Sequence, residues 1–217
     1  DPAFEALLID KLETDYPDTR MRFRSSTNAE DLEDFTGAGL YTSASGEVDD
    51  PSSPVLDAVR EVWGSLWNFR AFEERTYNGI DHQAVGMALL SHHSFPDEEA
   101  NGVALTNNMF DETQPGFYIN VQLGEESVVA PEYGVTVDSF LYYYYYPGQP
   151  MTFFSNSSLV PEGEHVLTAA ETYDLGVALD AIHQHFASYY FNGVDFYAMD
   201  VEFKFDDLDT GDEPSLW

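Results

Sequence analysis

The stretch Ala198-Met199-Asp200-Val201-Glu202-Phe203-Lys204-Phe205 is the clearest strand signal in the sequence. Because successive side chains of a strand point to opposite faces, Val201 and Phe203 are expected to enter a core, while Asp200 and Glu202 point away from it. Two carboxylates on one strand face can share Mg²⁺, which takes one or two carboxylates together with substrate phosphates. The alternative is a solvated strand face with an internal Glu202–Lys204 ion pair, which the spacing alone favours.

The residues before this strand alternate between helical and strand patterns. Thr168 and Glu171 have the spacing of a capping box, which predicts a helix start. Apolar periodicity predicts further helices over residues 3–13 and 55–67 and strands over residues 21–24, 84–90, 102–106, 117–122 and 140–146. Helices and strands mixed in this order predict an α+β or α/β fold.

Length and composition limit the class of protein. The 217 residues, 43% of them hydrophobic, suffice for one sizeable core or for two small lobes that share a cleft. No apolar run approaches the roughly 20 residues that span a bilayer. The absence of cysteine excludes disulfides and thiolate metal sites. No signal peptide is visible, but the start at Asp1 indicates a missing upstream part, so an exported parent protein stays open.

The chain is extremely acidic, with 40 acidic against 8 basic residues and a formal net charge of -32. Repulsion at this level excludes nonspecific binding to nucleic acid or anionic lipid as the main function. We interpret the acidic surface as an adaptation to high salt, where charges are screened, and expect a cytoplasmic protein of a halophilic or marine organism. A calcium-binding surface is the alternative, but the sequence has no D-x-[DN]-x-[DN]-G loop.

The basic residues are concentrated in the first third of the chain. All six arginines lie at or before Arg75, and Lys204 is the only lysine or arginine beyond it. Any polyphosphate site must therefore draw its cations from this part of the chain. In Arg24-Ser25-Ser26-Thr27, an arginine and hydroxyl groups at the end of a strand can present donors to phosphate oxygens. The alternative is an ordinary strand-to-turn connection.

A helix is expected to carry Arg70 and Arg75. Five residues correspond to about 140° around a helix, so the two need not contact the same phosphate. One can reach a ligand while the other pairs with Glu73 or Glu74, and a plain surface salt bridge is equally open. Zinc spacing, the G-x-S-x-G elbow, the Walker pattern and G-x-G-x-x-G are all absent.

Several motifs, in the same order along the chain, resemble the ATP-grasp nucleotide-binding domain of the dikinase superfamily. This superfamily includes phosphoenolpyruvate synthase, pyruvate phosphate dikinase, glucan water dikinase and rifampin phosphotransferase. The similar segments are Arg24–Leu32 (R-S-S-x-x-x-E-D-L), Phe35–Tyr41, Val62–Trp67 with Arg70 and Arg75, Asn101–Thr106, Leu123–Glu125 and Asp200–Glu202 (D-I-E).

This resemblance implies an α+β, ATP-grasp-like fold with a mixed sheet and flanking helices. Residues 1–217 would form one partial domain, without its N-terminal lobe and the downstream phosphohistidine and acceptor domains. The resemblance implies a phosphotransferase that binds Mg·ATP and passes a phosphoryl group to a histidine of another domain, from which pyruvate or another acceptor receives it. The isolated chain is expected to be inactive.

The resemblance also assigns roles to individual residues. Arg24, with Ser25, would hold phosphate oxygens, and Arg70 and Arg75 would add charge or brace the loop. Gly37 would let the backbone approach the nucleotide, and Asp200 and Glu202 would hold Mg²⁺, with Glu202 also contacting the nucleotide.

The sequence departs from the family pattern at three places. The family's N-terminal lysine and its Q-x-R-P glutamine are absent, and residues 92–95 read His-His-Ser-Phe where the family's adenine-side strand has Q-x-M-V. Two alternatives therefore stay open. One is a catalytically inactive nucleotide-binding or regulatory module with the same fold. The other is an acidic halophilic interaction protein that exposes a strand at Tyr142–Tyr146.

Overall fold

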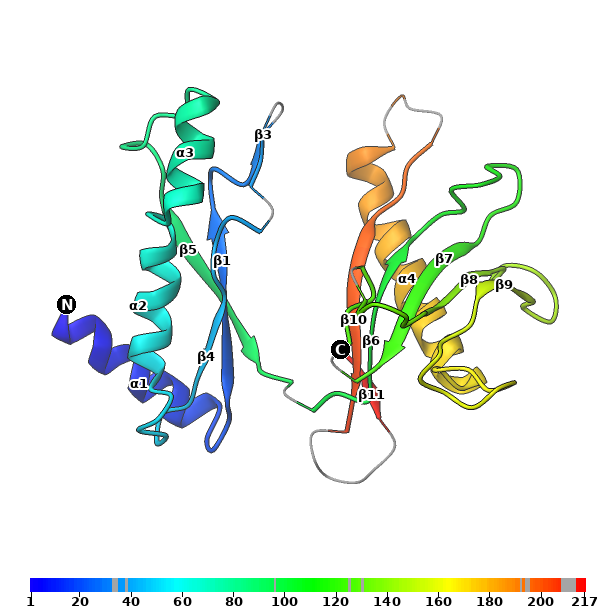
Figure 1. The fold of residues 1–217 in the computed structure, drawn as a ribbon, viewed down its shortest axis with the longest axis horizontal. Coiled ribbons are helices and arrows are strands. Elements are labelled where there is room, and N and C mark those ends of the chain that lie inside the picture. Colours follow the sequence, from blue (N-terminus) through cyan, green and yellow to red (C-terminus); the bar gives the residue numbers. More distant parts are fainter. Residues whose placement is uncertain are drawn as a thin grey trace. The chain divides into compact units, whose positions relative to one another are not determined.

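The protein is an α+β chain with two compact units, residues 1–94 and 95–217, each described by itself below (Figure 1). A computed structural model describes residues 1–32, 35–37, 39–95, 97–124, 126–129, 131–191, 193, 196–207 and 214–217. The predicted α+β class is confirmed. Glu125 of the predicted family segment 123–125 lies outside the described residues.

The first unit is built on a three-stranded antiparallel sheet. The strand order is β4-β1-β5, with β1 at Met21–Thr27, β4 at Ala44–Gly46 and β5 at Met87–His93. The unit also holds a two-stranded pair, β2 (Asp31–Leu32) with β3 (Phe35–Thr36), and the helices α1 (Pro2–Asp15), α2 (Val55–Ser65) and α3 (Phe69–Tyr77).

The core of this unit lies between α2 and one face of the sheet. Val55, Val59 and Val62 of α2 are buried together with Met21 and Phe23 of β1. The predicted apolar stripe of α2 is therefore confirmed at its valines. Trp63 and Trp67, which share the helical spacing of the valines, are exposed. In the apolar stripe of residues 3–13, Leu12 is buried and Leu8 packs against the same core, whereas Phe4 and Leu7 are exposed.

The second unit is a six-stranded sheet covered on one face by a long helix, α4 at Ala169–Tyr190 (Figure 1). The strand order is β11-β10-β6-β7-β8-β9, with β6 at Ala100–Leu105, β7 at Phe117–Leu123, β8 at Asp138–Tyr142, β9 at Met151–Ser155, β10 at Asp200–Asp206 and β11 at Ser215–Leu216.

All strand pairings in the two larger sheets are antiparallel, which corrects the mixed sheet that we expected. The connections explain this, because β6, β7, β8 and β9 follow one another in the chain and are neighbours in the sheet. Consecutive neighbouring strands pair antiparallel unless a crossover reverses the chain between them.

The capping box is confirmed at the start of α4. Thr168 accepts a hydrogen bond from the backbone of Glu171, and the Glu171 carboxylate accepts one from the backbone of Thr168. Leu175 and Leu179 of this helix enter the same core as Phe117 and Phe203.

Strand boundaries differ from the sequence prediction by a few residues, and the differences in β5 and β8 matter most. The strand expected over 84–90 is β5, which runs to His93, so His92 and His93 lie within it rather than after it. The strand expected over 140–146 ends at Tyr142, and Tyr143–Tyr146 form a turn in which the Tyr146 N–H donates to the Tyr143 carbonyl. Because Tyr142 is buried and the next residues turn, the exposed tyrosine strand of the interaction-protein alternative is not formed.

Among the helices formed by the described residues, none combines the length and the apolar character needed to span a membrane.

Candidate functional site

Arginines occupy the face of β1 that points away from the core. Met21 and Phe23 are buried against α2, so strand alternation turns Arg22 and Arg24 to the other face, and Arg20 precedes them on the same side. Burial lowers the pKa of Arg22, and the like charges of Arg24 and Arg20 lower it further. The positive charges of these guanidinium groups therefore repel one another, and an anion bound among them would relieve this repulsion.

Arg24 is held by a histidine of the neighbouring strand. Its Nε donates to His92 Nε2 at 3.0 Å, and His92 Nδ1 lies within hydrogen-bond distance of the His93 carbonyl. Because Nε2 accepts from arginine, Nδ1 carries the proton and donates to the carbonyl, so His92 is neutral in this arrangement. His92 thus fixes one edge of the Arg24 guanidinium.

The sequence-predicted neighbours of Arg24 do not gather on the same face. Ser25 follows Arg24 directly in β1, so alternation directs it to the opposite face. The Gly37 N–H donates to the Glu30 carbonyl at 2.6 Å. A side chain at Gly37 would meet Glu30 Cα at 2.9 Å and the Ala29 carbonyl at 3.1 Å. This glycine therefore permits a close approach of two backbone segments of the unit itself.

Arg75 lies at the centre of a buried network. It is 0% exposed, and its Nη2 donates to the Leu66 carbonyl at 2.6 Å. Its Nη1 donates to the Tyr41 hydroxyl at 3.2 Å, and its Nε donates to His82 Nδ1 at 3.3 Å. Tyr41 in turn donates to the Ala29 carbonyl at 3.0 Å. These contacts favour the bracing role of Arg75, because they join α3 to the segment that follows β1.

Arg70 differs from Arg75 although both lie on α3. Its side chain is exposed and forms no hydrogen bond or ion pair within the part of the chain that the structure describes. The helical spacing correctly separated the two arginines. Glu73 and Glu74 are not the partners of Arg75 in this network, whose acceptors are a carbonyl, a hydroxyl and an imidazole.

Asp200 and Glu202 lie on the outer face of β10, as the alternation predicted. Both are exposed, whereas Phe203 is buried on the α4 side. Side chains two residues apart on a strand lie about 7 Å apart at their bases, which is close enough for both carboxylates to reach one cation. Lys204, on the same face, pairs with Glu98.

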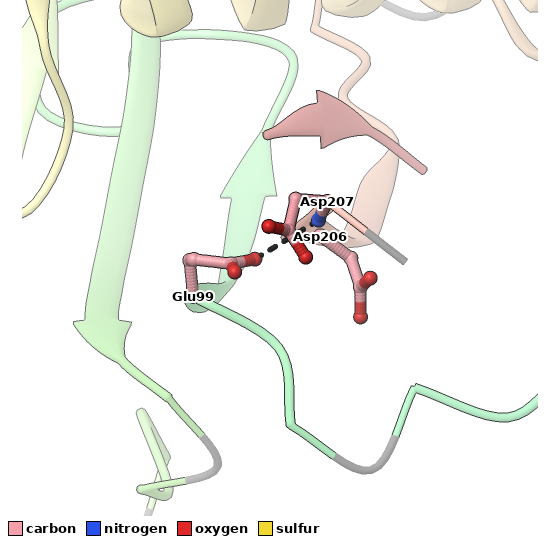
Figure 2. Close-up of side chains that lie close together, drawn as sticks. All are labelled: Glu99, Asp206 and Asp207. Atoms are coloured by element: carbon pink, nitrogen blue, oxygen red, sulfur yellow. Dashed lines mark hydrogen bonds between the residues drawn. The ribbon is translucent and has the colours of Figure 1, made fainter. Parts of the chain in front are cut away.

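A second group of carboxylates, which no sequence pattern indicated, lies at the other end of β10. Glu99, Asp206 and Asp207 place one carboxylate oxygen each within 4.8 Å of one another (Figure 2). The Asp207 N–H also donates to Glu99 at 3.1 Å. Only the register of β10 with β6 brings Glu99 to this position, so no local pattern could reveal it. Six residues of strand separate Asp200 from Asp206 by about 20 Å, so the two groups cannot share an ion.

An antiparallel α+β chain with arginines on one sheet face and paired carboxylates on another has the donors and acceptors that a metal-bound polyphosphate requires. The chain belongs to the family of the pyruvate phosphate dikinase AMP/ATP-binding domain, whose model matches residues 5–217. This membership supports an ATP-binding, dikinase-like role.

Similar proteins are phosphoenolpyruvate synthases. The chain is 30% identical over 149 residues to a probable phosphoenolpyruvate synthase of Pyrococcus abyssi, covering 63% of this chain and 17% of that protein. It is 33% identical over 122 residues to the phosphoenolpyruvate synthase of Pyrococcus furiosus, covering 54% of this chain and 14% of that protein. The chain therefore matches only a small part of the length of these relatives.

Proposed function

We propose that this chain binds Mg·ATP as the nucleotide-binding part of a phosphoenolpyruvate synthase-like dikinase. The complete protein would pass a phosphoryl group from ATP to a histidine on a separate domain, and pyruvate or another acceptor would then receive it. The observation that carries this proposal is the arginine row on β1, in which Arg24 is positioned by His92 and the pKa of Arg22 is lowered by burial and by the like charges of Arg24 and Arg20.

Within this proposal the arginines bind the phosphates. Arg24 would contact phosphate oxygens, and the exposed Arg70 would add charge without being fixed in advance. Arg75 would act indirectly by bracing the segment after β1 through Tyr41. Gly37 would keep that segment compact, since its close neighbours are backbone atoms. Ser25 would contribute its backbone at the end of the arginine row.

Asp200 and Glu202 fit a hard cation because carboxylate oxygens are the ligands that Mg²⁺ takes from proteins. A bound Mg²⁺ would neutralise phosphate charge during transfer. Phosphoryl transfer depends mainly on positioning and on charge neutralisation rather than on covalent catalysis by the protein. The exposed carboxylates on β10 and the arginines on β1 supply the two kinds of charge that this neutralisation uses.

A catalytically inactive nucleotide-binding or regulatory module is the second candidate. His92 favours it, because the imidazole bonded to Arg24 belongs to the segment that departs from the family's adenine-side pattern. This candidate predicts nucleotide binding without transfer of the phosphoryl group.

The test is a calorimetric titration of Mg·ATP into the chain in molar KCl, beside Arg24→Ala and Glu202→Gln. Arg60→Ala and Glu164→Gln make the same charge changes at exposed positions away from these strand faces. Weaker binding in the first two variants and unchanged binding in the two controls would support the site. Equal losses in the controls would show that net charge alone governs binding and would contradict it. A chain extended at both ends, supplied with labelled ATP, separates the two candidates by phosphohistidine formation.

A further inference from the structure

A cavity of about 260 Å³ lies within the second unit, on the α4 side of the sheet. We call it the His183 cavity, and its walls include Thr106, Glu112, Tyr145, His183, Phe191 and Tyr197. Thr106 directly follows β6. Because it is two residues after Ala104, its side chain points to the same face as Ala104, which packs in the core with α4. Asp200 and Glu202 point to the opposite face, so the cavity is separate from the proposed metal site.

Aromatic rings form one wall of the cavity. The His183 ring stacks on Tyr197 with centroids 4.6 Å apart, and Phe191 packs against Tyr197 at 6.2 Å. Tyr197 is buried, and its hydroxyl donates to the His183 carbonyl at 2.7 Å. The fold therefore holds the Tyr197 and His183 rings of this wall in place.

Two polar groups of the cavity, Thr106 and His183, are fixed as well. Thr106 is 2% exposed, and its hydroxyl oxygen lies 3.0 Å from His183 Nδ1 while accepting from the Met199 N–H at 2.8 Å. Burial lowers the pKa of His183, opposed by the nearby charge of Asp180, so the imidazole is neutral at pH 7. A neutral ring stacked on Tyr197 adds another π surface and does not repel a cation.

The charges around the cavity are negative. Glu112 lines it, and the Tyr145 hydroxyl donates to the Asp180 carboxylate at 2.8 Å, one helical turn before His183. Lys204 is the only lysine or arginine in residues 95–217, and it pairs with Glu98. Within this unit, an anionic ligand would therefore meet carboxylates without an arginine or a free lysine to compensate for them.

We propose that the His183 cavity binds a small organic cation, an ammonium group carried on an aromatic or branched apolar body. The carboxylates of Glu112 and Asp180 would attract the charge. The rings of Tyr197, Phe191 and Tyr145 would hold the cation by their π faces and bury its apolar part. The volume is near the lower end of small-molecule pockets, which fits a ligand the size of a phenylalkylamine.

The experiment compares three ligands of one shape and different charge: phenethylammonium, 2-phenylethanol and phenylacetate. Each is titrated into the full chain at pH 7.5 and followed by calorimetry and saturation-transfer NMR. We expect phenethylammonium to bind about tenfold more tightly than 2-phenylethanol, and phenylacetate to bind least. Equal affinities, a preference for phenylacetate, or no saturable binding of the cation up to about 10 mM would overturn the proposal.

Two variants locate the binding. Glu112→Gln should weaken the cation several-fold and leave 2-phenylethanol unchanged, and Phe191→Leu should reduce the preference for the cation. Both positions are exposed, so neither substitution is expected to prevent folding. Glu164→Gln, at an exposed position outside the cavity lining, serves as the matched control. Cation binding that both cavity variants leave unchanged would place the ligand elsewhere and overturn the assignment.

Discussion

The charged faces of β1 and β10 arise in the same way but are supported differently. In each strand, burial of alternate apolar residues turns charged residues to the opposite face. Arg24 in β1 is bonded to His92, and Arg22 Nη1 donates to the Ser45 hydroxyl at 3.2 Å. Asp200 and Glu202 in β10 are exposed and lie outside the buried core of their unit. The arginines of β1 are therefore part of the hydrogen-bonded structure of their unit. Substitution of Asp200 and Glu202, by contrast, is expected to cost little stability.

The largest effect is expected for Arg75→Leu on α3, which tests whether an arginine of the first unit is part of its fold. Removing a buried guanidinium leaves the Leu66 carbonyl and the Tyr41 hydroxyl without their donor. We expect the free energy of unfolding to fall by about 3 kcal/mol, measured by urea denaturation. Arg70→Leu on the same helix removes the same charge from an exposed position and should change it by about 0.5 kcal/mol or less. Similar losses in both variants would refute the bracing role of Arg75.

The next largest effect is expected for Arg24→Ala. Loss of charge-assisted hydrogen bonds to phosphate should weaken Mg·ATP about tenfold to a hundredfold, measured by calorimetry. His92→Ala, which removes the group that positions Arg24, should weaken binding by a smaller factor and mainly through a less favourable entropy of binding. If His92→Ala strengthened binding instead, the histidine would be a barrier to the nucleotide and the β1 face would not be pre-organised.

Substitution of the β10 carboxylates should weaken nucleotide binding without lowering the stability of the protein. The double variant Asp200→Asn, Glu202→Gln should lose about tenfold in ATP affinity, and only when Mg²⁺ is present. Its urea midpoint should stay close to that of the original protein, because both side chains are exposed. Glu99→Gln, about 20 Å along the strand, should leave the Mg²⁺ dependence unchanged. A Mg²⁺ dependence that is lost with Glu99→Gln instead would move the metal to the cluster of Figure 2.

The smallest expected effect concerns His183. Burial lowers its pKa from the ordinary 6.5, so the unfolded chain binds the proton more tightly than the folded one. The contribution of neutral His183 to the free energy of unfolding is therefore fully present above about pH 6.5. It decreases as the pH falls from there through the lowered pKa. In His183→Gln, the decrease in melting temperature between pH 7.5 and pH 5.5 should be smaller than in the original protein. An unchanged or steeper decrease would show that His183 does not contribute to this pH dependence.

Much of the fold follows from local sequence patterns. The alternation in β10 predicted which of its residues enter the core, and the Thr168–Glu171 capping box predicted the start of α4. The valine spacing predicted the buried side of α2. These signals succeed because strand alternation, helix periodicity and helix capping depend on residues a few positions apart.

Tertiary structure decided which charged groups are available and which are buried. Arg70 and Arg75 lie on the same short helix, yet one is exposed and the other is enclosed by Tyr41, Leu66 and His82. The pairing of Arg24 with His92 depends on the β1–β5 register, across 68 positions of sequence. Contacts at such separations are fixed by strand register and core packing, which no local pattern encodes. The sequence alone therefore determined the family, the α+β class and the charged faces of β1 and β10, and the packing determined what each charged residue can contact.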